Sequence, residues 1–139
     1  MIALDTNVLA RAIVAEADAD AATRRQQRDA RALLSSGADL FVPLTVAQEL
    51  EWMLRSVYEM PPADIADLFD DLLAVENVTV DRAAAVGQAV DGYRRGLDFS
   101  DALHHALSGA CAGFATFDAG FIKRARRLGL KPPVAASGN

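Results

Sequence analysis

Short apolar runs alternate with longer segments of helical periodicity along this chain. The apolar runs predict buried strands at residues 2–4, 40–42, 78–80 and 114–117, with a short edge strand at 134–135. Runs of this length, bounded by polar or turn-forming residues, are typical of strands in a parallel sheet. The alternation with helices therefore indicates an α/β fold.

The segments between the strands predict helices, at residues 19–35, 63–73, 82–93, 98–110 and 119–128, with a further helix starting at Thr45. Thr45 and Gln48 have the spacing of a capping box at that start. Apolar residues then recur at helical spacing as a core face, at Leu50, Met53, Leu54 and Val57. Gly37 is placed to end the first of these helices.

Length and composition indicate one globular domain over residues 1–139, because 52% of the residues are hydrophobic and 24% are charged. Cys111 is the only cysteine, so an intramolecular disulfide and a cysteine-ligated zinc site are excluded. We expect Cys111 to be a small core residue in a reducing compartment. No positively charged leader and no membrane-length apolar run is visible, which predicts a cytoplasmic protein without membrane contact.

The net charge of −5 argues at first against nucleic-acid binding, which usually needs a basic excess. Acids gathered around a metal ion would contribute to that total, so the sign does not decide. Basic residues crowd the C-terminal end, at Lys123, Arg124, Arg126, Arg127 and Lys131. Such asymmetry can form a local patch that attracts phosphate, although a solvated helix face is an equally plain interpretation.

Carboxylates follow the strands or open the helices at four separate places. Asp5 ends the first strand, Glu49 lies in the first turn of the helix after the second, Asp98 and Asp101 open a helix, and Asp118 follows the fourth strand. In a parallel α/β sheet these places share one edge, where ligands bind. Each acid taken singly could be a helix cap. Carboxylates brought together repel unless a cation lies between them, and an all-oxygen set suits Mg²⁺ or Mn²⁺.

Four segments that contain these acids resemble the motifs of PIN-domain nucleases, in the same order. They are residues 1–9 (MIALDTNVL), 45–54 (TVAQELEWML), 96–104 (GLDFSDALH) and 115–118 (ATFD). Within that family the chain resembles VapC-type toxins of bacterial toxin–antitoxin pairs. The resemblance implies a three-layer fold with a central parallel sheet of about five strands, ordered 3-2-1-4-5 and flanked by helices. It also implies Mg²⁺- or Mn²⁺-dependent endoribonuclease activity, a homodimer and a cognate antitoxin.

The resemblance also implies roles for particular residues. Four acids would be catalytic and hold the metal, namely Asp5, Glu49, Asp101 and Asp118, with Asp98 as an additional acid that ligates or orients. Small polar residues would aim these carboxylates, namely Thr6, Asn7 and Thr116. Basic residues would contact RNA phosphates, the candidates being Arg11, Lys123, Arg124 and Arg127.

Two other functions remain open. A catalytically inactive PIN-like fold could serve as a binding module, although the acid set is complete. A Mg²⁺-dependent phosphatase of the haloacid-dehalogenase type would need a second aspartate where Asn7 stands. We interpret Trp52 and Tyr58 as core or dimer contacts, not as platforms for base stacking. The target RNA, the antitoxin and the number of metal ions cannot be read from the chain.

Overall fold

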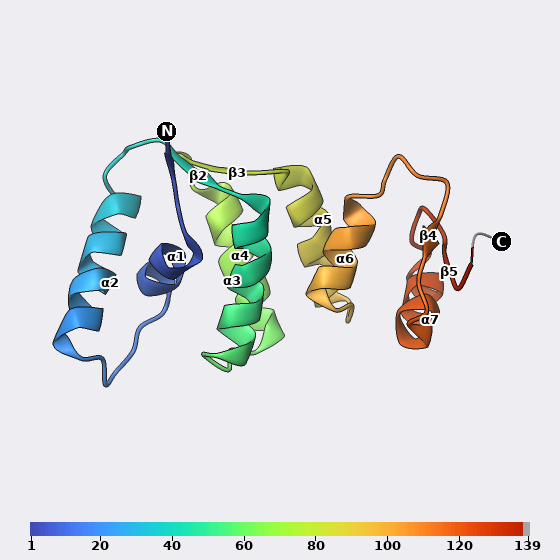
Figure 1. The fold of residues 1–139 in the computed structure, drawn as a ribbon, viewed down its shortest axis with the longest axis horizontal. Coiled ribbons are helices and arrows are strands. Elements are labelled where there is room, and N and C mark those ends of the chain that lie inside the picture. Colours follow the sequence, from blue (N-terminus) through green and yellow to red (C-terminus); the bar gives the residue numbers. More distant parts are fainter. Residues whose placement is uncertain (138–139) are drawn as a thin grey trace. The chain divides into compact units, whose positions relative to one another are not determined.

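The computed structural model describes residues 1–137, so residues 138–139 of the predicted single domain lie outside the described residues. The chain forms two compact units, Met1–Ala83 and Ala84–Asn139. The first unit runs from blue to green-yellow in Figure 1 and the second from yellow to red. Both units contain helices and parallel strands, which confirms the predicted α/β class.

The first unit contains a parallel sheet of three strands in the order β1-β2-β3. Its strands are β1 (Ile2–Ala3), β2 (Leu40–Val42) and β3 (Val78–Val80). Ile2 lies opposite Leu40, which lies opposite Val78. The expectation of about five strands in the main sheet is wrong for residues 1–137, because the two remaining strands pair with each other instead. The 3-2-1 part of the expected order is confirmed.

Four helices pack in the first unit, namely α1 (Thr6–Ile13), α2 (Ala21–Leu34), α3 (Leu44–Ser56) and α4 (Pro62–Ala74). Helix α1 contacts both α2 and α3, and α4 contacts α3 and β3. The side chains that fill this core are almost fully enclosed, among them Leu9, Leu40, Leu50, Leu54, Ile65 and Phe69. Burial of these apolar side chains supplies the main driving force for the unit.

Two features of the helices differ from the sequence-based predictions. Helix α1 was not predicted, because its polar first residues, Thr6 and Asn7, resemble a loop that ends the strand. The capping box at Thr45 is wrong, because α3 begins one residue earlier, after Pro43. Proline fixes its own φ near the value that a helix start needs and has no amide hydrogen to satisfy. Thr45 consequently lies inside the first turn of α3 and not at its cap.

The second unit contains α5 (Ala83–Arg94, whose first residue closes the first unit), α6 (Phe99–Ala106) and α7 (Ala119–Leu128). Strands β4 (Phe114–Ala115) and β5 (Val134–Ala135) pair in parallel, which confirms the predicted fifth strand. Aromatic rings pack edge to face in the core, with centroids 5.5 Å apart for Tyr93 and Phe99 and 5.8 Å apart for Phe114 and Phe121.

Helix α6 and strand β4 are both shorter than predicted. Helix α6 ends at Ala106 and not at residue 110, where the Ser108 hydroxyl donates to the carbonyl of His104 across 2.8 Å. Such a side chain competes with the backbone amide that would continue the helix. Strand β4 ends at Ala115 because Thr116 Oγ1 accepts a hydrogen bond from the amide of Asp118 and turns the chain there.

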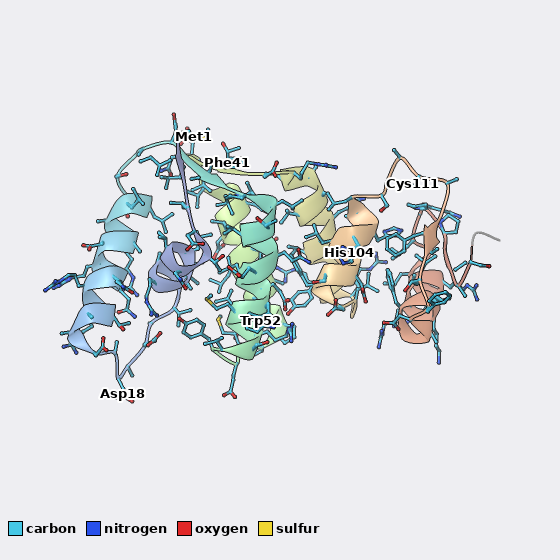
Figure 2. All side chains as sticks on the ribbon, in the orientation of Figure 1. Met1, Asp18, Phe41, Trp52, His104 and Cys111 are labelled. Atoms are coloured by element: carbon cyan, nitrogen blue, oxygen red, sulfur yellow. The ribbon has the colours of Figure 1, made fainter. Side chains whose placement is uncertain are left out.

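Cys111, which was expected in the core, and Trp52, which was expected in the core or in a dimer contact, are both exposed (labelled in Figure 2). Cys111 is exposed, so the prediction of a small core cysteine is wrong. Its Ala-rich neighbourhood follows the end of α6 and is a sequence of turns. Trp52 is 53% exposed, which excludes a core role and leaves the dimer contact as a prediction. No helix within residues 1–137 is long and apolar enough to cross a membrane.

Candidate active site

Asp5 stands at the junction between β1 and α1. The amide of the buried residue before it, Leu4, donates to the carbonyl of Phe41 across 2.9 Å, which ties this junction to β2. The exposed Asp5 is the N-cap of α1, and its Oδ1 accepts from the amide of Thr6 across 2.8 Å. One carboxylate oxygen is thus engaged by the backbone, while Oδ2 has no such role in the cap.

Glu49 is held beside this junction by Thr6. It lies in the second turn of α3 and not in the first, because the helix begins at Leu44. Thr6 is only 1% exposed, and its hydroxyl donates to Glu49 Oε1 across 2.5 Å. Because Thr6 directly follows Asp5, this hydrogen bond brings the α3 carboxylate to the carboxyl end of β1. The remaining lone pairs of Asp5 and Glu49 are available for a cation.

Asn7 belongs to a different feature of the same unit. It lines a hollow of about 510 Å³ between α1 and α2, together with Val8, Arg11, Gln26, Asp29, Ala30 and Leu33. Its side chain is exposed on the first turn of α1. A role in aiming a carboxylate stays a prediction for this residue.

In the second unit, Asp98 and Asp101 are joined at the start of α6. Asp98 is the N-cap, and its Oδ2 accepts from the amide of Asp101 across 3.1 Å. This is the capping contact that the plain interpretation of Asp98 predicts. Asp101 lies deeper, being partly buried, whereas Asp98 is exposed. The two acids therefore differ in environment although they share one helix start.

The pKa of the Asp101 carboxyl is raised above its usual value. Burial is the largest cause, and the negative charges of Asp98 and then Asp118 add to it, while His104 and Arg124 oppose the rise. Three acids from two segments of this unit are consequently close enough to repel one another. A bound divalent cation would remove that repulsion. The structure thus supports the predicted meeting of Asp101 with Asp118.

Asp118 caps α7 on a turn with little freedom. Its Oδ1 accepts from the amide of Phe121 across 3.0 Å, and its own amide donates to Thr116 Oγ1 across 3.1 Å. Arg124 lies against the same turn. A Cβ atom added to Gly120 would lie 3.2 Å from Arg124 Nη1 and 3.3 Å from Asp118 Oδ1. The absence of a side chain at Gly120 leaves a cation and an acid side by side.

Donor chemistry decides which metal these acids fit. The acids and the threonine hydroxyls that contact them supply hard oxygen donors suited to Mg²⁺ or Mn²⁺, and His104 lies near Asp101 as well. Among residues 1–137, no three histidine, cysteine or acidic side chains are gathered tightly enough to hold a metal ion. The structure instead places Glu49 beside the Asp5–Thr6 junction in the first unit, and Asp98 and Asp118 near enough to Asp101 in the second unit to raise its pKa.

The basic residues differ in how they are engaged. Arg11 is already bonded within the first unit, to Gln26 Oε1 at 3.0 Å, Glu16 Oε1 at 3.2 Å and the Tyr58 hydroxyl at 3.1 Å. Burial raises the pKa of the half-buried Tyr58, which therefore stays a neutral partner. The remaining three candidates are exposed on α7, namely Lys123, Arg124 and Arg127.

One residue of this neighbourhood was assigned wrongly from the sequence. Phe117 was placed in the fourth buried strand, but its side chain is 94% exposed on the turn between Thr116 and Asp118. The available signal was the alternation of strands, which puts Phe114 and Thr116 on one face and Phe117 on the other. Glu51 was also overlooked; it is 2% exposed and pairs with Arg55 at 2.8 Å, a structural ion pair on α3.

Comparison with known proteins identifies the family of the chain. A family model described as PIN domain matches residues 2–127, which is most of the chain. No curated protein and no solved structure matches it. The match includes Asp5, Glu49, Asp101 and Asp118, the four acids on which the resemblance was built. The chain belongs to the PIN domain family.

Proposed function

We propose that this PIN-domain protein is a Mg²⁺- or Mn²⁺-dependent endoribonuclease and the toxin of a toxin–antitoxin pair. Membership of the family points to nuclease activity in general. The observation that carries the metal dependence is the placement of Asp98 and Asp118 near the partly buried Asp101, whose pKa is raised first by burial and then by those two charges. Such mutual repulsion destabilises the free protein, so acids arranged in this way are typical of functional sites.

In the proposed mechanism the metal-binding acids would be Asp5 and Glu49 in the first unit, and Asp101 and Asp118 in the second. Asp98 orients Asp101 through its contact with the Asp101 amide. When bound, the ion supplies a water of lowered pKa for attack on phosphorus and offsets charge on the phosphate. Thr6 and Thr116 aim the acids through the hydrogen bonds described above, and Asn7 is assigned the same task. No covalent nucleophile from the chain is needed.

Substrate binding is assigned to basic residues, chiefly Lys123, Arg124 and Arg127 on α7. Their exposure leaves them accessible to RNA phosphates. Arg11 is the weaker candidate, because its guanidinium already has three partners within the first unit. We further propose a cytoplasmic homodimer that a cognate antitoxin inhibits.

The activity is tested by incubating the purified protein with RNA in Mn²⁺, in Mg²⁺ and in EDTA. Cleavage of internal linkages in either metal, abolished by EDTA and by Asp5→Asn, supports the proposal. Intact RNA under all conditions would favour the inactive binding module. Release of inorganic phosphate from a small monoester, with RNA left intact, would favour the phosphatase.

The toxin role needs a separate test in cells. Induced expression in a bacterium is expected to stop growth, and the Asp118→Asn variant is expected to remove the effect. Co-expression of the open reading frame adjacent to this one is expected to restore growth. Normal growth under induction, with the wild-type protein present and able to cleave RNA in vitro, would exclude the toxin role but not the nuclease.

A further inference from the structure

Phe117 is the most exposed large hydrophobic side chain among residues 1–137, at 94%. Single exposed hydrophobic residues are common on protein surfaces, so exposure alone carries no conclusion. What distinguishes Phe117 is its place, directly before Asp118 and directly after Thr116. An aromatic ring therefore projects from the same turn that carries a proposed metal-binding acid.

The turn fixes the backbone that carries this ring. The amide of Thr116 donates to the carbonyl of Ala135 across 3.0 Å, and that of Asp118 donates to Thr116 Oγ1 across 3.1 Å. Asp118 in turn caps α7. Because both neighbours of Phe117 are already hydrogen-bonded, the turn would lose little backbone freedom when a partner stacks on the ring. The backbone thus presents the ring to solvent at a defined point next to Asp118.

The surroundings of the ring are charged and not apolar. Asp118 and Arg124 lie side by side next to Gly120, on the first turns of α7. Within the second unit, Phe117 is the one exposed large hydrophobic residue among those described. A stable protein interface buries about 800 Å² of each partner around an apolar centre, and one ring among charged groups does not offer such a centre. A nucleotide, with a flat base and a phosphate, fits a ring beside an arginine.

We propose that Phe117 is the platform on which an unpaired base of the RNA stacks, next to the phosphate that is cleaved. This inference rests on the proposed nuclease function and adds a substrate class to it. Bases in a duplex are covered on both faces by their neighbours, whereas an unpaired base offers a face to an aromatic ring. The substrate is therefore RNA that is single-stranded or looped out at the cleavage site.

The inference is tested by measuring the Kd of a fluorescent 12-nucleotide single-stranded RNA in EDTA, where no cleavage occurs. Phe117→Ala is expected to weaken binding by about 5- to 150-fold, the range for loss of one stacked base. Phe117→Trp, which keeps an aromatic face, should bind within about twofold of wild type. Phe117→Leu, which keeps the hydrophobicity but not the ring, should behave like Phe117→Ala. Trp52→Ala is the matched control with another exposed aromatic residue and should bind normally.

A second readout reports stacking directly. 2-Aminopurine placed in the RNA loses fluorescence when it stacks, so its quenching by wild type should disappear with Phe117→Ala. A duplex of the same sequence should show no dependence on Phe117. Equal affinities for wild type and Phe117→Ala, or normal binding by Phe117→Leu, would overturn the inference. A lower oligomeric state of Phe117→Ala, with RNA binding unchanged, would show that the ring contacts protein instead.

These outcomes separate the inference from the proposed function. Phe117-dependent binding by a protein that cleaves nothing in Mn²⁺ or Mg²⁺ would exclude the nuclease and keep the stacking platform. Metal-dependent cleavage at an unchanged KM in Phe117→Ala would keep the nuclease and exclude the platform. If the protein is a nuclease and Phe117 is its stacking platform, the KM for single-stranded RNA should rise in Phe117→Ala.

Discussion

The hydroxyl of Thr6 donates a hydrogen bond to Glu49 Oε1 across 2.5 Å, between residues that are 43 positions apart in the chain. Thr6 is buried while Glu49 is exposed, so the fixed partner is the threonine. Hydrogen bonds to an ionised acceptor are the stronger kind, and they restrict the direction of the carboxylate. The pair joins the start of α1 to α3 and places Glu49 next to Asp5.

Replacing Thr6 by valine is expected to reduce RNA cleavage by about 10- to 100-fold, because residues that orient metal ligands typically contribute that much. Valine keeps the volume and removes the donor, so the free energy of unfolding should fall by only about 1 kcal/mol. Cleavage rates in Mn²⁺ and urea unfolding of the same preparation measure both effects. Thr6→Ser, which keeps the hydroxyl, is the control and should retain most of the activity. A valine variant as active as wild type would remove Thr6 from the site.

Asp101 is expected to lower the stability of the metal-free protein and to contribute to metal binding. Burial first, and then the charges of Asp98 and Asp118, raise its pKa above the usual value. A raised pKa means that the protonated Asp101 favours the folded state and that the ionised carboxylate disfavours it. The stabilising contribution of Asp101 is therefore fully present below its unfolded pKa and is lost as the pH rises through its folded pKa. Asp101→Asn should therefore raise the Tm in EDTA by about 1–3 °C, a small shift because the site is partly solvated.

The same variant should lose its response to metal. Ligands that bind only the folded state raise the Tm, so millimolar Mn²⁺ should stabilise wild type and leave Asp101→Asn nearly unchanged. Differential scanning fluorimetry with a Mn²⁺ titration measures both values. Asp91→Asn is the matched control, since Asp91 is an exposed acid of the same unit that pairs with Arg95. An equal Mn²⁺ shift in all three proteins would exclude Asp101 as a ligand.

Hydrophobic pattern predicted the strands and most helices of this protein, but the expectation that the first strand is buried is wrong, because both residues of β1 are exposed. The range of β2 and that of α7 agree with the structure at both ends. Boundaries failed where a side chain or a proline sets the end of an element, as at Ser108 and Pro43. Helix α1 was missed because Asp5 caps it immediately after the strand, which leaves no loop in the sequence to mark a new element.

The acids could be located from the sequence because strand ends and helix starts are where a parallel α/β fold exposes polar groups. The hydrogen-bond partners of these acids could not be predicted from the sequence. The contact between Thr6 and Glu49 depends on how α1 packs against α3, which no local pattern encodes. Phe117 was misplaced although strand alternation separates it from Phe114 and Thr116, because the apolar run alone does not show that the strand ends at Ala115.

Asp118→Asn is expected to reduce RNA cleavage at least about 100-fold, because loss of a ligand should cost more than loss of a residue that only orients one. The asparagine can still accept the hydrogen bond from the Phe121 amide and so keep the cap of α7. Multiple-turnover kinetics on single-stranded RNA in Mn²⁺, with Asp91→Asn as control, measure the loss. Activity within threefold of wild type would contradict the assignment.

Arg124 is expected to contact RNA phosphate from its position beside Asp118. Its charge lowers the pKa of Asp101, which places it within reach of the acids, and its side chain is exposed on α7. Each phosphate contact to a single strand adds about 0.7 to the slope of log Kd against log salt. Arg124→Ala should reduce that slope by about 0.7, and Arg124→Lys should restore it, since the contact requires charge.

Titrations at four KCl concentrations in EDTA measure the slope. Arg95→Ala, in which an arginine paired with Asp91 is removed, is the control and should leave the slope unchanged. A slope that is the same in Arg124→Ala and wild type would mean that α7 does not bind the RNA backbone through this residue.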